Sequence, residues 1–213
     1  MRKHLTLLFA AATLLTACDK NDAPTPADNG NFFTSYLDIE SMSLRDDESL
    51  QGFVLEFSGK EINARNEPER FRELAEKNRD TEFSGAARPM QTFAQRIAFI
   101  EITANREYDS AHPAGSSLRD VFGICADSYR TFIESGYRTS ESDGELLVLR
   151  KLVSDTEDTD YRCWSTAPLA PYLYMAKPFT QLGTTYQFTV SVTLDDGRTF
   201  IRTTPQSNAG CGH

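Results

Sequence analysis

Several residues and motifs that commonly mark a chemical activity are scarce or missing in this 213-residue chain. It has only three histidines, and only His112 lies away from the two termini. This scarcity argues against a zinc site with several histidine ligands, and we expect no metal site. The motifs G-x-S-x-G, H-E-x-x-H and G-x-x-x-x-G-K do not occur, so several hydrolase and nucleotide-binding classes lose support. We name no catalytic residue and expect no cofactor.

Basic residues are outnumbered, with 22 Lys and Arg against 31 Asp and Glu, a net charge of -9. No run of the sequence gathers Lys and Arg into a cluster. Because proteins that bind nucleic acids neutralise phosphates with such clusters, we expect no nucleic-acid partner. The hydrophobic share of 39% is enough for one sizeable core, and the length fits a single domain.

The N-terminus has the order of a signal peptide. Arg2 and Lys3 precede the apolar run from Leu5 to Leu15, which is too short to span a bilayer as a stable helix. Small residues then precede Cys18, and the sequence LTAC resembles the lipobox of bacterial lipoproteins. During the maturation of such lipoproteins, the cysteine thiolate accepts a diacylglyceryl group. We therefore expect residues 1–17 to be removed and Cys18 to be lipidated.

A lipid on Cys18 implies a membrane partner and a place in the cell envelope, on the periplasmic face or the surface of the outer membrane. The mature chain would have 196 residues (213 less 17) and, without Arg2 and Lys3, a net charge of -11. Residues 18–31 are polar and read as a flexible tether. Asp19, Lys20 and Asp22 also resemble the charged export signal of Bacteroidota surface lipoproteins, although a plain solvated linker explains them equally well.

Alternating apolar residues predict strands near 35–43, 52–58, 96–104, 145–153 and 169–175, with the strand at 96–104 in the centre of a sheet. Residues 184–204 predict a hairpin with a type I′ turn at Asp196 and Gly197. Asn66 predicts the N-cap of a helix. A second helical segment is expected over 117–126, followed by a further turn or two that end at Gly136.

These elements favour a mainly β fold, an antiparallel immunoglobulin-like β-sandwich with two inserted helical segments. An open α+β sheet is the alternative. We assign residues 32–205 to a single β-rich domain and residues 206–213 to a loose tail.

Three cysteines remain if Cys18 carries lipid, and an odd count leaves at least one thiol unpaired. A disulfide between Cys125 and Cys163 is one interpretation, and a Cys163 to Cys211 bond is another. Three reduced thiols, two of them buried, are the third.

Aromatic residues gather around Cys163 and suggest a binding platform. Trp164, Tyr161, Tyr172 and Tyr174 could stack against sugar rings and are our candidate ligand-binding residues, although aromatics at this spacing also suit a core.

Beyond the lipobox, three segments resemble a family of Bacteroidota lipoproteins of about this size with no established activity. The segments are YLDIESMSL, EYDSAHPAGSSLRDVF and TVSVTLDDGRTFIRTTP. The resemblance spans most of the mature chain and carries over no catalytic residue.

We therefore expect a lipid-anchored envelope lipoprotein that binds a ligand, a glycan or an envelope protein without catalysis. A structural component of a surface complex and a carboxylate-based hydrolase are the alternatives. The hydrolase would need two carboxyl groups facing each other roughly 5–9 Å apart in a cleft.

Overall fold

The computed structural model describes residues 30–47, 52–85, 90–138, 147–157, 160–166, 170–177, 185–204 and 207–208. This part of the chain is mainly β, with two α-helices and one short 3-10 helix. The elements in chain order are β1 (Ser35–Asp47), β2 (Gly52–Asn63), α1 (Pro68–Lys77), β3 (Gln91–Phe93), β4 (Ile97–Ala104), β5 (Phe122–Ser128), α2 (Arg130–Glu134), β6 (Leu147–Leu152), η2 (Val153–Asp155), β7 (Tyr172–Met175), β8 (Thr185–Tyr186), β9 (Phe188–Leu194), β10 (Thr199–Thr203) and β11 (Ser207–Asn208).

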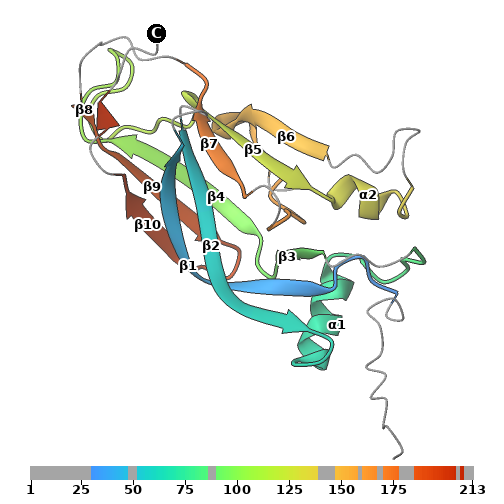
Figure 1. The fold of residues 1–213 in the computed structure, drawn as a ribbon. Coiled ribbons are helices and arrows are strands. Elements are labelled where there is room, and N and C mark those ends of the chain that lie inside the picture. Colours follow the sequence, from blue (N-terminus) through green and yellow to red (C-terminus); the bar gives the residue numbers. More distant parts are fainter. Residues whose placement is uncertain are drawn as a thin grey trace, which may run out of the picture.

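Two sheets form the body of the domain. The larger has the order β3-β1-β2-β7-β5-β6, and the smaller has the order β10-β9-β4 (Figure 1). Neighbouring strands in them are antiparallel except β1 and β3. Leu55 and Ile124 of the larger sheet share one buried cluster with Ile102 and Val192 of the smaller. The mainly β, sandwich-like architecture with few helices is confirmed.

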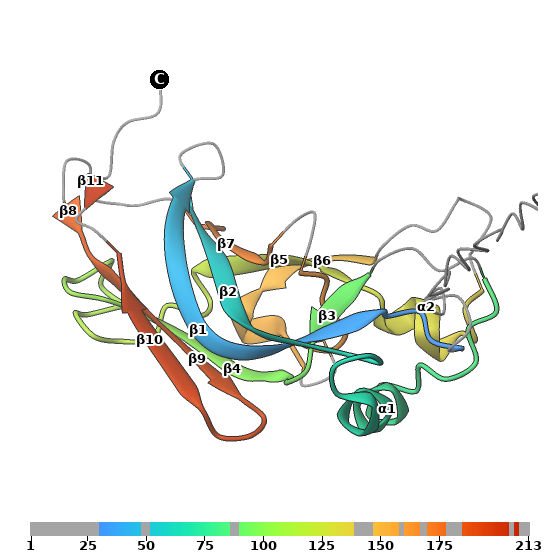
Figure 2. The same ribbon diagram turned by 60° about the horizontal axis from the view of Figure 1, so that its bottom comes forward.

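A second buried cluster fills the end of the molecule where β1 begins. Figure 2 shows α1 and α2 on either side of the first residues of β1. There, Phe71 and Leu74 of α1 pack with Phe33 and Tyr36 from the start of β1 and the residues before it. Ile133 of α2 belongs to the same cluster. The apolar residues of α1 are therefore buried, while the rest of the helix faces solvent.

The predicted helix over 117–126 is wrong, because Phe122–Ser128 form β5. This strand pairs with β6 on one side and β7 on the other, and all seven of its residues are buried. Burial on both faces removes the alternation by which a strand is recognised in sequence. The following turn is helical as expected, and Gly136 ends it with a positive φ of 72°.

The position of β4 also differs from prediction, because it is an edge strand of the smaller sheet. Its Phe99 is 40% exposed, and the Arg119 guanidinium lies 4.2 Å from the centre of that ring. The cation covers part of an aromatic face that a neighbouring strand would otherwise cover.

The hairpin of β9 and β10 is confirmed, but its turn is not type I′. A type I′ turn needs positive φ at both central residues, whereas Gly197 has φ 88° and Asp196 is not positive. The Gly197 N–H donates to the Leu194 carbonyl at 3.0 Å. This is a three-residue loop that ends in a left-handed glycine.

Two smaller differences concern the first residue of α1 and the C-terminal segment. The N-cap of α1 is Glu67 and not Asn66, whose side-chain oxygen instead accepts a hydrogen bond from the Asn63 N–H at 2.7 Å. In the segment predicted to be a loose tail, Ser207 and Asn208 pair with β8.

Candidate ligand-binding site

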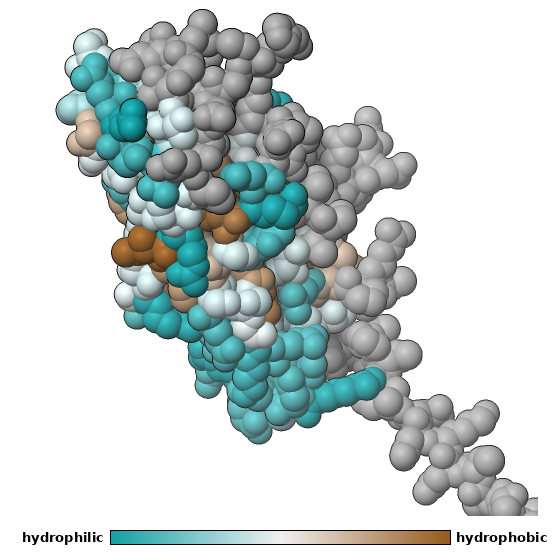
Figure 3. Space-filling view, turned by 60° about the vertical axis from the view of Figure 1, so that its left-hand side comes forward, coloured by the Kyte–Doolittle hydropathy of each residue, from teal (hydrophilic) through white to brown (hydrophobic). Residues whose placement is uncertain are grey.

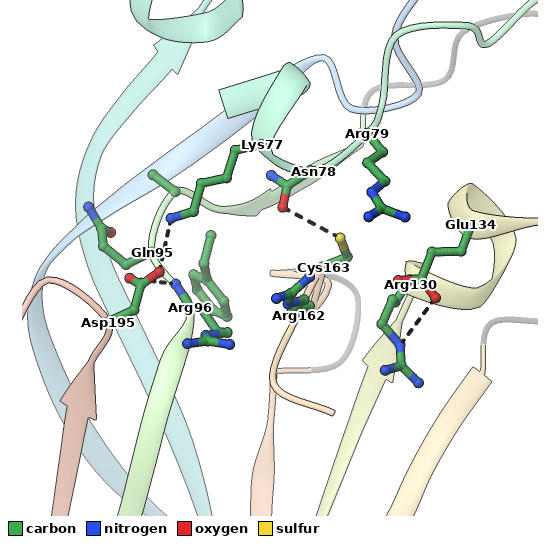
Figure 4. Close-up of a pocket in the computed structure, with 12 residues that line it drawn as sticks. Lys77, Asn78, Arg79, Gln95, Arg96, Arg130, Glu134, Arg162, Cys163 and Asp195 are labelled. Atoms are coloured by element: carbon green, nitrogen blue, oxygen red, sulfur yellow. Dashed lines mark hydrogen bonds and ion pairs between the residues drawn. The ribbon is translucent and has the colours of Figure 1, made fainter. Parts of the chain in front are cut away.

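Five basic side chains from separate parts of the chain line one cavity of about 180 Å³, which we call the basic cavity. Figure 4 shows that they come from the end of α1, the start of β4, α2 and the segment before Trp164. Two carboxylates, Glu134 and Asp195, also line it. The basic residues are Lys77, Arg79, Arg96, Arg130 and Arg162.

The end of α1 places Arg79 at the cavity in an unusual conformation. The Arg79 N–H donates to the Glu76 carbonyl, and the Asp80 N–H donates to the Ala75 carbonyl at 2.9 Å. This pattern is a Schellman motif, in which the residue after the C-cap is usually glycine. Arg79 occupies that position with φ 58°, and a left-handed residue with a Cβ costs roughly 1–2 kcal/mol. Such strain clusters at functional sites.

Cys163 lies at the cavity and also has a left-handed backbone, with φ 52°. Its Sγ donates to Asn78 Oδ1 at 3.8 Å (Figure 4). Burial, together with the negative charge of Asp80, raises the pKa of the Cys163 thiol to about 12. The thiol is therefore protonated at neutral pH and is neither a nucleophile nor a negative charge.

The positive charges of the basic cavity are only partly balanced. Lys77 Nζ lies 2.9 Å from an Asp195 carboxylate oxygen, and Arg130 Nε lies 3.9 Å from Glu134. Within the described ranges, no carboxylate forms an ion pair with the remaining three guanidinium groups, those of Arg79, Arg96 and Arg162. The arrangement can therefore receive an anion.

The predicted aromatic platform is divided between two places. Trp164 is 1% exposed and its Nε1–H donates to the Asp160 carbonyl at 2.7 Å. Tyr161 is buried beside it, with the two ring centres 5.4 Å apart. Both residues belong to the core between the sheets, so neither offers a free ring face to a sugar.

Tyr172 and Tyr174 lie on β7 and are partly exposed. Arg150 stacks over the Tyr174 ring at 4.9 Å from its centre. The same ring lies so close to Gly123 that a Cβ there would come within 2.2 Å of it. Neighbouring residues of the sheet therefore already occupy the surroundings of the Tyr174 ring.

The disulfide between Cys125 and Cys163 is not formed, because both are free, buried thiols. Successive residues of a strand point to opposite faces. Ile124 and Ala126 of β5 point into the core, so Cys125 points to the other face of the sheet. Cys163 belongs to the separate cluster against α1. The alternative bond to Cys211 lies outside the described residues.

His112 connects two loops and does not line the basic cavity. Its Nδ1 lies 2.7 Å from Asp109 and its Nε2 lies 3.0 Å from Asp120, which also pairs with Lys177. Burial lowers the pKa of His112, but the hydrogen bonds to the two carboxylates raise it more, and the net shift is upward. Both ring nitrogens are engaged, so the imidazole holds the two loops together, and we call this arrangement the His112 clamp.

Large apolar side chains are scarce on the surface of the described residues. Figure 3 shows scattered brown residues on a mostly teal and white face. Over the described ranges, the exposed large hydrophobic residues are Phe99 and Ile201. The same ranges hold no group of three or more His, Cys, Asp or Glu side chains placed to bind a metal, and no helix there is long and apolar enough to cross a membrane.

Comparison of the chain with protein-family models, with curated proteins and with solved structures returns no match. None of the residues that line the basic cavity was singled out by sequence except Cys163. The five cations lie at positions 77, 79, 96, 130 and 162, and no local pattern joins them.

Proposed function

We propose that this protein is a lipid-anchored protein of the cell envelope that binds an anionic ligand in the basic cavity without catalysing a reaction on it. The observation that carries the proposal is the accumulation of five cations around one cavity in a chain of net charge -9. Like charges in proximity repel one another, and a bound anion removes that cost. An acidic protein that concentrates positive charge at one place therefore favours anions there.

The chemistry of the lining residues supports binding over catalysis. Glu134 and Asp195 are both paired with cations, and the Cys163 thiol is protonated. A carboxylate-based hydrolase needs one free carboxylate and one protonated carboxyl group facing each other. Charge-assisted hydrogen bonds from guanidinium groups are instead the usual means of holding a carboxylate or phosphate.

The anchor is supported by the basic residues, the apolar run and the lipobox that precede Cys18. Incorporation of a clickable palmitate analogue measures it directly. We expect wild-type protein to be labelled in the membrane fraction and Cys18→Ala to be unlabelled. Labelling of Cys18→Ala would contradict the anchor and leave the binding proposal standing.

Binding is tested by thermal unfolding with sulfate, phosphate or succinate, each compared with sodium chloride at the same ionic strength. An anion present at 100 times its dissociation constant stabilises the folded state by about 2.7 kcal/mol. We expect at least one of the three to raise the melting temperature of the wild type, and to raise that of Arg162→Gln much less.

Arg72→Gln is the matched control, because it removes one exposed positive charge from α1 outside the basic cavity. It should respond to the anions as the wild type does. An equal response of all three proteins would show that the anions act on the general surface charge. No response beyond that to sodium chloride would contradict anion binding.

A further inference from the structure

The positive charge of the residues that line the basic cavity exceeds what a ligand with a single negative charge would neutralise. Its lining holds five cations and two carboxylates, a formal charge of +3. A carboxylate ligand brings one negative charge and two oxygens. A phosphate monoester brings nearly two negative charges at neutral pH and three strong acceptor oxygens. The second ligand matches far better the guanidinium groups of Arg79, Arg96 and Arg162, which form no ion pair with a carboxylate of the described residues.

The donors of the cavity also suit such a group. Each guanidinium presents N–H donors in a fixed fork that fits two oxygens of a phosphate. Asn78 is already engaged with a protein group, because its Oδ1 accepts from the Cys163 thiol. Phe93, Ala94 and the neutral thiol of Cys163 are the apolar residues among those that line the cavity. The site therefore recognises a charged group more than a carbon skeleton.

The size of the basic cavity agrees with this chemistry. The basic cavity has a volume of about 180 Å³ and is open to solvent on one side, which leaves room for a phosphate group and the first atoms of its ester.

We propose that the basic cavity binds the phosphate group of a phosphate monoester, an inference that rests on the proposed function. The ester is either a soluble molecule or the headgroup of a lipid, because the cavity would recognise the same group in both. The attachment of the tether to the domain makes the second source worth a separate arm of the experiment.

The tether enters the fold directly beside the cavity. The N–H groups of Phe32 and Phe33 donate to the buried carboxylate of Asp80 at 2.7 and 2.8 Å. Asp80 follows Arg79 in the chain, so this clamp fixes the end of the tether next to a cavity-lining cation. The 11 residues between Cys18 and Gly30 span at most roughly 40 Å. A Cys18 anchor would hold the basic cavity within reach of lipid headgroups.

Titration calorimetry of the full-length protein in detergent micelles tests the phosphate chemistry with glycerol 1-phosphate and with glycerate, its carboxylate counterpart. We expect glycerol 1-phosphate to bind at least about tenfold more tightly than glycerate, since additional charge-assisted hydrogen bonds form. Arg162→Gln and Arg79→Gly should each weaken the phosphate ester about tenfold or more, whereas Arg72→Gln should bind like the wild type.

The second arm uses protein reconstituted in phosphatidylcholine vesicles with and without phosphatidic acid, whose headgroup is a phosphate monoester. Competition by phosphatidic acid with glycerol 1-phosphate identifies a headgroup as a ligand. Binding of glycerol 1-phosphate without such competition identifies soluble esters as the ligands, and both results support the proposal.

Two results would overturn it, and they differ in what they leave standing. Equal affinity for glycerate and glycerol 1-phosphate, lost together in Arg162→Gln, would refute phosphate selectivity and keep the anion-binding function. Failure of every anion to bind would refute both.

Discussion

The conformation of Arg79 leads to opposite expectations for stability and for binding. A left-handed backbone costs a residue with a Cβ roughly 1–2 kcal/mol, and glycine avoids this cost. Glycine also adds about 0.4–1 kcal/mol of conformational freedom to the unfolded chain. The difference predicts that Arg79→Gly is between about as stable as the wild type and roughly 1.6 kcal/mol more stable. The same change removes a guanidinium group from the basic cavity.

Arg79→Ala is the matched variant, because it loses the same guanidinium but keeps a Cβ in the strained conformation. Urea unfolding followed by the fluorescence of the buried Trp164 measures both free energies. We expect Arg79→Gly to be more stable than Arg79→Ala, and both to bind anions about 10–150-fold more weakly than the wild type. An Arg79→Gly protein that is less stable than Arg79→Ala would refute the assigned helix end. Unchanged anion affinity in both would refute the role of Arg79.

Three further predictions concern residues outside the cation set. Trp164→Ala should destabilise the fold by about 3–5 kcal/mol in urea unfolding, since it empties a core position; a loss below about 1 kcal/mol would contradict its burial. The raised pKa of His112 implies that its charged form stabilises the fold below about pH 6.5, and that this contribution disappears as the pH rises through the folded-state pKa. The difference in unfolding free energy between wild type and His112→Asn should therefore be larger near pH 5.5 than near pH 8.5, and a difference independent of pH would contradict the clamp. Peptide mapping after alkylation of the native protein should find Cys125 and Cys163 reduced and slow to react, and recovery of a peptide linking the two would contradict their separation.

The parts of the fold that sequence predicts are those governed by local periodicity. The alternation through Phe188, Val190 and Val192 follows directly from one buried face of β9. The seven residues of β5 carry no such pattern, because covering elements bury both of their faces. The residues that pair with β5 lie 19 to 29 positions further along the chain on β6, and 47 to 53 positions further along on β7.

The basic cavity could not be predicted for a related reason. Its cations are dispersed through a sequence that is acidic overall, and only the packing of α1, α2 and the β4 end brings them together. The conclusion that the sequence holds no basic cluster is correct along the chain and incomplete in three dimensions. The aromatic residues around Cys163 are close together in the sequence and therefore suggested a binding site. Trp164 and Tyr161 are instead buried in the core between the sheets.

The most direct test of the account is to locate a bound oxyanion in crystals of the protein. Tungstate mimics phosphate, and its anomalous scattering identifies its position without ambiguity. The account predicts an anomalous peak inside the basic cavity, within hydrogen-bond distance of guanidinium nitrogens of Arg79, Arg96 or Arg162, that is absent in crystals of Arg162→Gln. Tungstate bound only elsewhere, with the basic cavity empty, would contradict the central claim.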